Sequence, residues 1–253
     1  MVEEAQTGPL TGDGIGPRVP LRSIWFDCDS TLSSIEGIDE LAAWRDDATR
    51  RDITALTERA MAGELPLEAV YGERLRRIAP SSDECEALGA RYVATALGDA
   101  ALVVAALRQL GKAVGILSGG LRPPVLVLAR ALGIDPARVL AVELVFDAAG
   151  RYVDFVRTSG LWRRGGKPDA LRARPADERP HALVGDGGTD LEASAAVDRF
   201  VGFGGVIARP NVVAGARWFV RAPRLGATLP FLLTTAELAA LRGEPRFATL
   251  RLE

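Results

Sequence analysis

The sequence contains one histidine in 253 residues, and this scarcity disfavours several classes of catalyst. His181 opens an apolar run that ends at Asp186, which places the imidazole at the amino end of a predicted strand, away from the acid. Ser-His-Asp hydrolysis, cysteine–histidine chemistry and zinc sites built from several histidines are therefore disfavoured together. Any catalysis by this chain is expected to use carboxylates.

Cysteines and long apolar runs are scarce as well. Cys28 and Cys85 make no disulfide framework, which fits a reducing cytoplasm, and the carboxylates on either side of Cys28 disfavour a nucleophilic thiolate. No run approaches the roughly 18 apolar residues of a membrane span. The N-terminus has acids at Glu3 and Glu4 and lacks the apolar segment of a signal peptide. We expect a cytoplasmic protein without a membrane partner.

A large excess of charge of one sign is also absent. Lysine and arginine number 31, aspartate and glutamate number 33, and the basic residues are scattered along the chain. No nucleic-acid partner is therefore expected. A hydrophobic content of 48% is typical of a soluble globular protein, and 253 residues suffice for one large domain or for a core with an insertion.

The two ends of the chain carry no catalytic motif. Residues 1–20 are rich in Gly and Pro without periodicity and are predicted to form a flexible leader. Within them, Gly12–Pro17 resembles a phosphate-binding loop but lacks the strand before it and the helix after it that such a loop needs. The tail, residues 222–253, is predicted to hold one helix, Thr234–Arg242.

Residues 38–97 show helical periods only, and we expect them to form a small helical bundle. Ser81 and Glu84 have the spacing of a capping box, which predicts the start of a helix. The apolar stripes comprise Leu67, Val70, Tyr71, Leu75 and Ile78 in one helix and Cys85, Leu88, Tyr92 and Leu97 in the next.

From residue 98 onward, helical and strand patterns alternate. A helix near 99–110 precedes a strand at 113–118, after which Gly119 and Gly120 are expected to turn into another helix. Residues 139–147 and 151–156 are predicted to pair around a turn at Ala149 and Gly150. The other expected strands are the run from Ile24, 181–185, 199–203 and 218–220.

This alternation predicts an α/β fold. We expect a Rossmann-like, mostly parallel sheet flanked by helices, because helices that alternate with strands form right-handed crossovers. Residues 21–37 and 98–221 would form this core, and residues 38–97 would be inserted as a helical-bundle cap.

Asp27 and Asp29 follow the first predicted strand, one residue apart. Side chains at i and i+2 of a strand point to the same side, and two carboxylates so placed repel each other unless a cation lies between them. Ligands of parallel sheets bind beyond the carboxyl ends of the strands. The pair therefore favours a divalent cation with oxygen ligands, the alternative being an acidic turn without function.

Three further polar clusters follow strands or lie in glycine-rich turns. Ser118–Gly120 offers a hydroxyl and backbone N–H groups for a phosphate, Lys167 follows two glycines in a flexible turn, and Asp186 and Asp190 follow an apolar strand. Singly, these are an ordinary strand-to-helix turn, a surface lysine and a helix N-cap. The order and placement of all four clusters together favour a catalytic site.

The four clusters resemble the four motifs of the haloacid dehalogenase superfamily of phosphohydrolases. Over residues 22–220 the chain is similar in particular to the phosphoserine phosphatase family within it. The segments that carry this similarity are Asp27-Cys-Asp-Ser-Thr, Glu36-Gly-Ile-Asp-Glu-Leu, Ala60-Met-Ala-Gly, Glu73-Arg-Leu, Leu117-Ser-Gly-Gly, Gly166-Lys, Gly185-Asp-Gly and Gly202-Phe-Gly-Gly.

The resemblance implies different roles for the aspartates. Asp27 would attack phosphorus and become an aspartyl phosphate, while Asp29 would protonate the leaving oxygen and then deprotonate the attacking water. Mg²⁺ would be held by the carboxylates of Asp27 and Asp186 and the backbone carbonyl of Asp29. A carboxylate nucleophile is already ionised at neutral pH, whereas Asp29 must carry a proton, so we expect its pKa to be raised relative to that of Asp27.

The resemblance also implies the remaining site residues and the substrate, O-phospho-L-serine. Arg74 would bind the serine carboxylate and Glu36 its ammonium group. The phosphoryl group would be held by Ser118, Gly119 and Lys167, with Thr31, Gly187 and Asp190 in supporting positions.

Arg74 stands out independently of the family, because it lies in the middle of an apolar helical stripe. From spacing alone it can extend outward to solvent, pair with a structural acid or point into a polar pocket; the resemblance favours the pocket. The segment Val206–Pro210 keeps an arginine, Arg209, where the family has one, in a different neighbourhood.

Three alternatives stay open at this point. The chain can act on another small phosphomonoester or as a phosphotransferase, it can bind phosphorylated ligands without turnover, or it can be a phospho-acceptor signalling domain. Asp29 has no use in mere binding, and a signalling domain needs no helical cap. A small-molecule substrate and a monomer or homodimer are expected.

Overall fold

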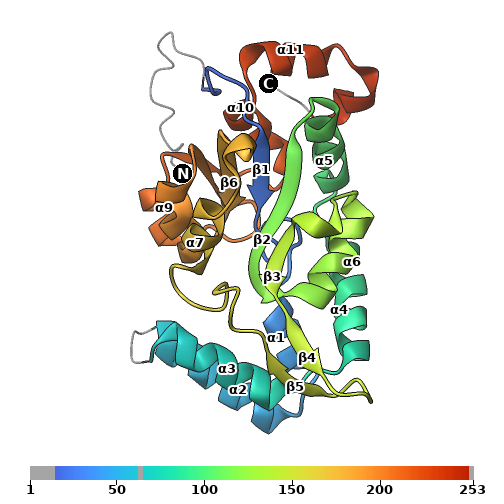
Figure 1. The fold of residues 1–253 in the computed structure, drawn as a ribbon, viewed down its shortest axis with the longest axis vertical. Coiled ribbons are helices and arrows are strands. Elements are labelled where there is room, and N and C mark those ends of the chain that lie inside the picture. Colours follow the sequence, from blue (N-terminus) through green and yellow to red (C-terminus); the bar gives the residue numbers. More distant parts are fainter. Residues whose placement is uncertain (1–14, 62–64, 251–253) are drawn as a thin grey trace, which may run out of the picture.

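The computed structural model describes residues 15–61 and 65–250. The main sheet has six strands in the order β3-β2-β1-β6-β7-β8, and all neighbouring pairs are parallel (Figure 1). The predicted fold class is confirmed. The strands are β1 (Ser23–Phe26), β2 (Ala113–Leu121), β3 (Val139–Val142), β6 (His181–Gly185), β7 (Arg199–Phe203) and β8 (Trp218–Val220).

The register of β1 brings the polar clusters together. β1 is buried along its whole length, as expected for a central strand of a parallel sheet. Its last residue, Phe26, pairs with Ile116 of β2 on one side and with Val184 of β6 on the other. The residues just beyond these positions therefore meet at one edge of the sheet. The strand order reverses around β1, and such a switch point leaves a crevice for ligands.

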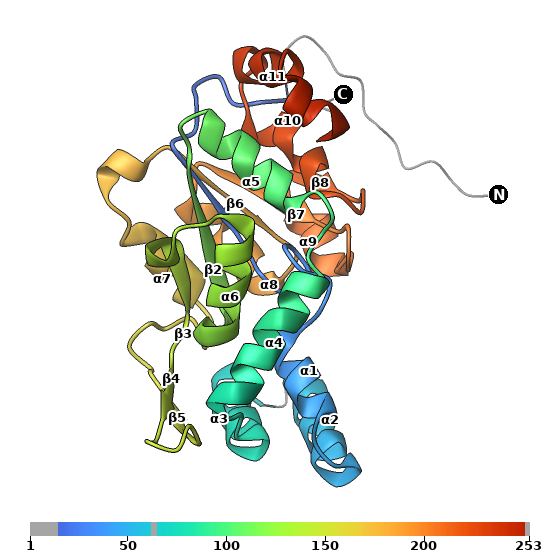
Figure 2. The same cartoon turned by 90° about the vertical axis from the view of Figure 1, so that its right-hand side faces the viewer.

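Helices cover both faces of this sheet. α5 (Ala100–Gln109) and α6 (Arg122–Leu132) lie on one side in Figure 1, and α7 (Gly166–Arg172) and α9 (Pro210–Gly215) lie on the other. α8 (Gly188–Glu192) follows β6 directly. Figure 2, turned by 90°, shows α5 above α6.

Between β1 and α5 the chain forms the helices of the cap, at the lower end of Figure 1. They are α1 (Gly37–Ala43), α2 (Asp47–Met61), α3 (Leu67–Ile78) and α4 (Ser82–Ala94). The predicted capping box is present, because Glu84 N donates to Ser81 Oγ at 3.1 Å and Ser81 N donates to Glu84 Oε2 at 2.9 Å. Beside α3 lies an antiparallel hairpin of β4 (Leu144–Phe146) and β5 (Tyr152–Phe155).

The predicted single strand at 139–147 is wrong, because the chain breaks it at Glu143. The first half, β3, pairs in parallel with β2, and the second half, β4, pairs with β5 around the predicted turn. Only the first half has a place in the sheet, which leaves Val145 of β4 exposed. The pattern of apolar residues indicates a strand, but it does not indicate which neighbouring strand each half pairs with.

The predicted turn at Gly119 and Gly120 is also wrong. Both glycines belong to β2, which runs on to Leu121 and pairs again with Val142 after an irregularity. The next helix, α6, starts at Arg122 and carries two prolines in its first turn, where the missing N–H groups cost nothing.

The tail holds more than the one predicted helix. Besides α11 (Thr235–Arg242) it contains the short α10 (Leu229–Leu232) and 3₁₀ turns at Leu225–Thr228 and Pro245–Leu250. Four residues are too few to show a helical period, so α10 has no signal in the sequence. Residues 1–14 of the predicted leader, 1–20, lie outside the described residues, and with them the first half of its glycine-rich segment, 12–17.

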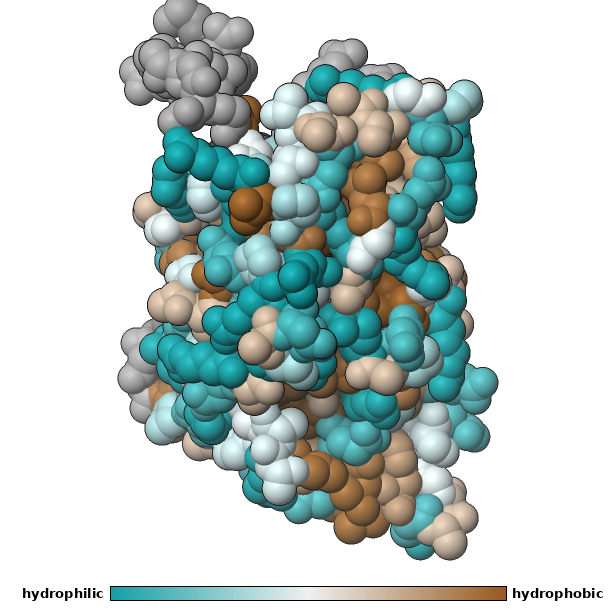
Figure 3. Space-filling model, turned by 45° about the horizontal axis from the view of Figure 1, so that its top comes forward, coloured by the Kyte–Doolittle hydropathy of each residue, from teal (hydrophilic) through white to brown (hydrophobic). Residues whose placement is uncertain are grey.

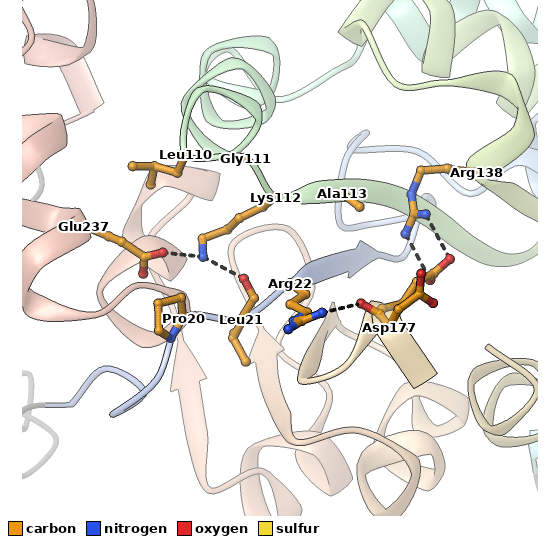
Figure 4. Close-up of a pocket in the computed structure, with 11 residues that line it drawn as sticks. Pro20, Leu21, Arg22, Leu110, Gly111, Lys112, Ala113, Arg138, Asp177 and Glu237 are labelled. Carbon is orange, nitrogen blue, oxygen red and sulfur yellow. Dashed lines mark hydrogen bonds and ion pairs between the residues drawn. The ribbon is translucent and has the colours of Figure 1, made fainter. Parts of the chain in front are cut away.

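Lys112 ties this tail to the core at the amino ends of β1 and β2. Its buried ammonium group donates to the Leu21 carbonyl at 2.8 Å and forms an ion pair with Glu237 of α11 at 2.7 Å (Figure 4). A cavity of about 540 Å³ opens beside this pair. Arg138 lines the same cavity and pairs with Glu178 at 3.2 Å. These charges satisfy one another, at the edge of the sheet opposite the polar clusters.

We expect Glu237→Gln to lower the free energy of unfolding by about 3 kcal/mol, because it leaves the buried Lys112 ammonium without a counter-charge. The double variant Lys112→Met/Glu237→Gln should recover much of this loss. Urea unfolding monitored by circular dichroism measures the change. Arg151→Ala, which removes an exposed ion pair with Asp147, is the control and should cost less than about 1 kcal/mol. Equal losses in Glu237→Gln and the control would contradict the assigned role of the buried pair.

The molecular surface shown in Figure 3 is mostly hydrophilic, with an apolar area at its lower end. Figure 1 places the cap and the β4–β5 hairpin at that end, and the hairpin exposes Val145 and Val153. No helix formed by the described residues has the length and apolar character that a membrane crossing requires.

Candidate active site

A cleft of about 1140 Å³ lies between the carboxyl edge of the sheet and the cap. Its lining comes from strand ends of the core and from the cap helices α1 and α3. The residues predicted from the sequence that line it are Asp27, Asp29, Glu36, Arg74, Ser118, Gly119, Lys167, Asp186 and Gly187. Thr31 and Asp190 lie directly behind the lining, each bonded to a residue of it.

Asp27 lies at the end of β1 with both carboxylate oxygens in contact with donors. The backbone N–H of Cys28 donates to Oδ1 at 2.8 Å, and Lys167 Nζ lies 3.0 Å from Oδ2. These contacts fix the carboxylate where β1 opens into the cleft. A carboxylate held in this way is suited to nucleophilic attack.

Asp27, Asp186 and Asp190 form a buried acidic cluster whose ligand atoms all lie within 4.8 Å of one another. Burial and the Asp27 charge raise the pKa of Asp186 to about 6, although Arg209 opposes the shift. Thr31 Oγ1 donates to Asp186 Oδ1 at 3.1 Å. Buried carboxylates grouped this closely mark a position for a cation among oxygen ligands.

Lys167 is a buried residue of the first turn of α7, and the prediction that a flexible turn presents it is wrong. Its Nζ lies 2.6 Å from Asp190 Oδ1 as well as near Asp27. Burial favours the neutral amine, but the carboxylates of Asp190 and Asp27 outweigh it and raise the pKa of Lys167. The lysine therefore stays cationic beside Asp27.

Asp190 reaches this position because Gly185, the last residue of β6, has no side chain. A Cβ at Gly185 would lie 2.3 Å from Asp190 Cγ. Asp190 Oδ2 also accepts a hydrogen bond of 3.0 Å from the backbone N–H of Gly187. The spacing Gly185-Asp-Gly therefore packs two carboxylates against one strand end.

Ser118 and Gly119 lie in the last part of β2, with Ser118 fully buried. Ser118 Oγ accepts a hydrogen bond of 2.9 Å from the backbone N–H of Gly120, which leaves the hydroxyl proton free to be donated into the cleft. The pair provides the hydroxyl and the backbone amide that the sequence predicts for anion binding.

Asp29 lines the same cleft. Its Oδ1 accepts hydrogen bonds from the Tyr92 hydroxyl at 2.5 Å and from the Gly37 N–H at 2.8 Å. Burial, followed by the charges of Glu36 and Asp27, raises the pKa of Asp29 to about 8. The pKa of Asp29 is thus raised from its ordinary value, the direction expected of a residue that carries a proton. Burial also raises the pKa of Tyr92, which therefore remains a donor.

Glu36 and Arg209 form a second charged network at the cleft. Arg209 bonds Asp186 Oδ2 at 2.9 Å and Glu36 Oε1 at 2.8 Å, and Ser30 Oγ donates to the same Glu36 oxygen at 2.7 Å. Among the described residues no donor bonds Glu36 Oε2. Ser30 has a left-handed backbone with φ of 52°, a strained conformation that places its hydroxyl next to Glu36.

Arg74 extends from α3 of the cap into the cleft and pairs with Asp39 of α1. Its Nε is buried, and no acceptor among the described residues reaches it. A buried donor left unpaired is costly and points to a ligand acceptor in the cleft. A neighbouring cap residue, Tyr71, donates from its hydroxyl to the Gly119 carbonyl at 2.8 Å and so joins the cap to β2.

Tyr71, Tyr92 and Arg209 were not predicted to belong to this site. Tyr71 and Tyr92 have the spacing of core residues in helical stripes, and only the tertiary structure reveals where their hydroxyls point. Arg209 was noted in the sequence without a role. By contrast, His181 lies at the amino end of β6 as predicted and bonds the Ala196 carbonyl, far from the acids. Burial raises the pKa of Cys28, as expected of an unreactive thiol.

The charges and donors of the cleft fit a hard divalent cation. The acidic cluster carries three carboxylates, whereas Lys167 and Arg209 supply two positive charges beside it. A bound phosphate group would add further negative charge. Carboxylate oxygens suit Mg²⁺ and Ca²⁺ better than softer metals. The residues present therefore fit a metal ion.

Comparison with known proteins agrees with this geometry. A family model described as haloacid dehalogenase-like hydrolase matches residues 24–195. The phosphoserine phosphatase of Rattus norvegicus is 34% identical over 202 residues, which cover 78% of this chain and 88% of the relative. That of Halobacterium salinarum is 35% identical over 182 residues, which cover 70% of this chain and 83% of the relative. A solved phosphoserine phosphohydrolase-like protein from Francisella tularensis superposes with a TM-score of 0.70 at 22% identity, covering 87% of this chain and 99% of that chain.

Proposed function

The chain belongs to the haloacid dehalogenase-like hydrolases, and we propose that it is a phosphoserine phosphatase that hydrolyses O-phospho-L-serine to L-serine and phosphate through an aspartyl phosphate. The observation that carries the substrate assignment is the unpaired Nε of Arg74, buried on the cap side of the cleft that contains Asp27. An acceptor on the substrate, and not only its phosphate, is needed to satisfy that group.

In the first step, an oxygen of Asp27 attacks phosphorus while the bond from phosphorus to the serine oxygen breaks. Asp29 is protonated at neutral pH and gives its proton to that leaving oxygen. In the second step, water attacks the aspartyl phosphate, Asp29 takes a proton from it, and the bond between Asp27 and phosphorus breaks. Both aspartates then return to their starting states.

The phosphoryl oxygens are held by Ser118 Oγ, the Gly119 N–H and Lys167 Nζ. These groups neutralise charge and keep attacking and leaving oxygens in line, which is most of what phosphoryl transfer requires. The cation is proposed to be Mg²⁺, held by the carboxylates of Asp27 and Asp186 and the backbone carbonyl of Asp29. When bound, it supplies further neutralisation of the phosphoryl charge. Thr31, Gly187 and Asp190 orient these ligands.

The two ends of the serine moiety are recognised by opposite charges. Arg74 binds the carboxylate through the Nε that has no protein acceptor. Glu36 binds the ammonium group through Oε2, because Ser30 and Arg209 both occupy Oε1. The enzyme is proposed to act in the cytoplasm, as a monomer or homodimer. Another small phosphomonoester, phosphotransfer or binding without turnover remain as alternatives, and Asp29 argues against mere binding.

A panel of phosphomonoesters tests this proposal. We expect rapid phosphate release from O-phosphoserine, much slower release from phosphoethanolamine and sugar phosphates, and none in excess chelator. Mg²⁺ should restore activity, whereas Ca²⁺ should bind but support it poorly, because its looser coordination holds the phosphoryl group out of line. Phosphate release measured colorimetrically decides the outcome. Full activity in excess chelator would contradict the metal, and preference for a substrate without a carboxylate would contradict phosphoserine.

A further inference from the structure

The hydroxyl of Tyr92 lies in an unusual place for a side chain whose ring is part of a hydrophobic core. The residue is fully buried on α4, and its hydroxyl is 2.5 Å from Asp29 Oδ1. A buried tyrosine hydroxyl needs a partner. Here the partner is the group that must move the proton in the reaction.

Gly37 donates to the same carboxylate oxygen as Tyr92, and its lack of a side chain makes room for the tyrosine hydroxyl. Its N–H donates to Asp29 Oδ1 at 2.8 Å. A Cβ at Gly37 would lie 2.0 Å from the Tyr92 oxygen, so the glycine leaves the space that the hydroxyl occupies. The first residue of α1 and a residue of α4 therefore converge on one oxygen.

The other oxygen of Asp29 faces the phosphoryl-binding residues. A Cβ built on Gly120 would lie 2.9 Å from Asp29 Oδ2, 3.1 Å from Ser118 Oγ and 3.7 Å from the Tyr92 oxygen, so Gly120 leaves the space in which Oδ2 lies near Ser118. Oδ1 already accepts two hydrogen bonds, so the proton of the acid form belongs on Oδ2.

We propose that Tyr92 is a positioning residue that, together with the Gly37 N–H, holds Asp29 Oδ1 so that Oδ2 delivers the proton to the leaving oxygen. Because both donors belong to cap helices, a displaced cap would release the acid from this orientation. The inference deepens the proposed function and rests on it, since it concerns the acid of the same reaction.

The test is Tyr92→Phe, which keeps the ring and removes the hydroxyl. Single-turnover measurements follow formation of the aspartyl phosphate by the release of serine from phosphoserine and of p-nitrophenolate from p-nitrophenyl phosphate. The serine oxygen needs a proton as it leaves, whereas p-nitrophenolate does not. We expect the variant to be about 10–100-fold slower on phosphoserine, with KM changed less than about 3-fold, and close to wild type on p-nitrophenyl phosphate.

Tyr152→Phe on the β4–β5 hairpin is the matched control and should change neither rate. Equal losses on both substrates, or a change in KM alone, would show that Tyr92 only supports the fold and would overturn the inference. The wild-type rates test the proposed function separately. If another alkyl phosphomonoester proves the better substrate, it replaces phosphoserine in the same comparison. A wild-type protein that hydrolyses none of them contradicts both.

Discussion

Asp27→Asn is expected to reduce phosphate release by about 10⁴–10⁶-fold, the size of loss that follows removal of a covalent nucleophile. The amide nitrogen and oxygen of asparagine cannot form the aspartyl phosphate, yet the side chain keeps the shape of aspartate. The Cys28 N–H can still donate to the amide oxygen, as it does to Asp27 Oδ1. The fold should therefore survive, although Lys167 loses one of its two carboxylate partners.

Two measurements separate this loss from damage to the structure. Wild-type protein quenched during turnover should contain one acid-trapped phosphoryl group, detected by intact-protein mass spectrometry, and Asp27→Asn should contain none. Asp154→Asn on the exposed hairpin is the control and should behave as wild type in both respects. Turnover by Asp27→Asn near the wild-type rate would rule out the covalent mechanism.

The sequence predicts those parts of the site that depend on local pattern. An apolar run that ends in Asp27 predicts a buried strand with an acid at its carboxyl end, and the same holds for Asp186. Parallel strands place these ends at one edge whatever their exact register. The resemblance adds roles to the same residues. In the structure the predicted site residues line the cleft, except Thr31 and Asp190, which lie directly behind its lining.

The parts that sequence reasoning misses depend on contacts between distant segments. Tyr92 has the spacing of a core residue, and its ring is indeed buried, but nothing in its helix indicates that 63 positions earlier in the chain a carboxylate meets its hydroxyl. The bridge from Arg209 to Glu36 spans an even longer separation. Likewise, the break in the strand pattern at Glu143 follows from where neighbouring partners end, and the local composition does not contain that information.

Arg74→Ala is expected to lower kcat/KM for phosphoserine by about 10³–10⁴-fold while changing that for phosphoethanolamine little. Phosphoethanolamine lacks the carboxylate, so the wild-type enzyme already leaves Arg74 unpaired when it binds this substrate. A site built around a polar group rejects an analogue that lacks its partner by up to about 10⁴–10⁵-fold. Removal of the guanidinium should therefore erase the preference for phosphoserine.

The structural cost of this substitution should be small. In the structure Arg74 pairs with Asp39, which is largely exposed and can be hydrated once the arginine is gone. Arg76→Ala on the same helix removes an exposed arginine that pairs with Glu73 and is the matched control. It should leave both substrates unchanged. The measurement is kcat/KM on both substrates for wild type and both variants. Equal losses on phosphoserine and phosphoethanolamine in Arg74→Ala would show that this arginine is structural and does not bind the serine carboxylate.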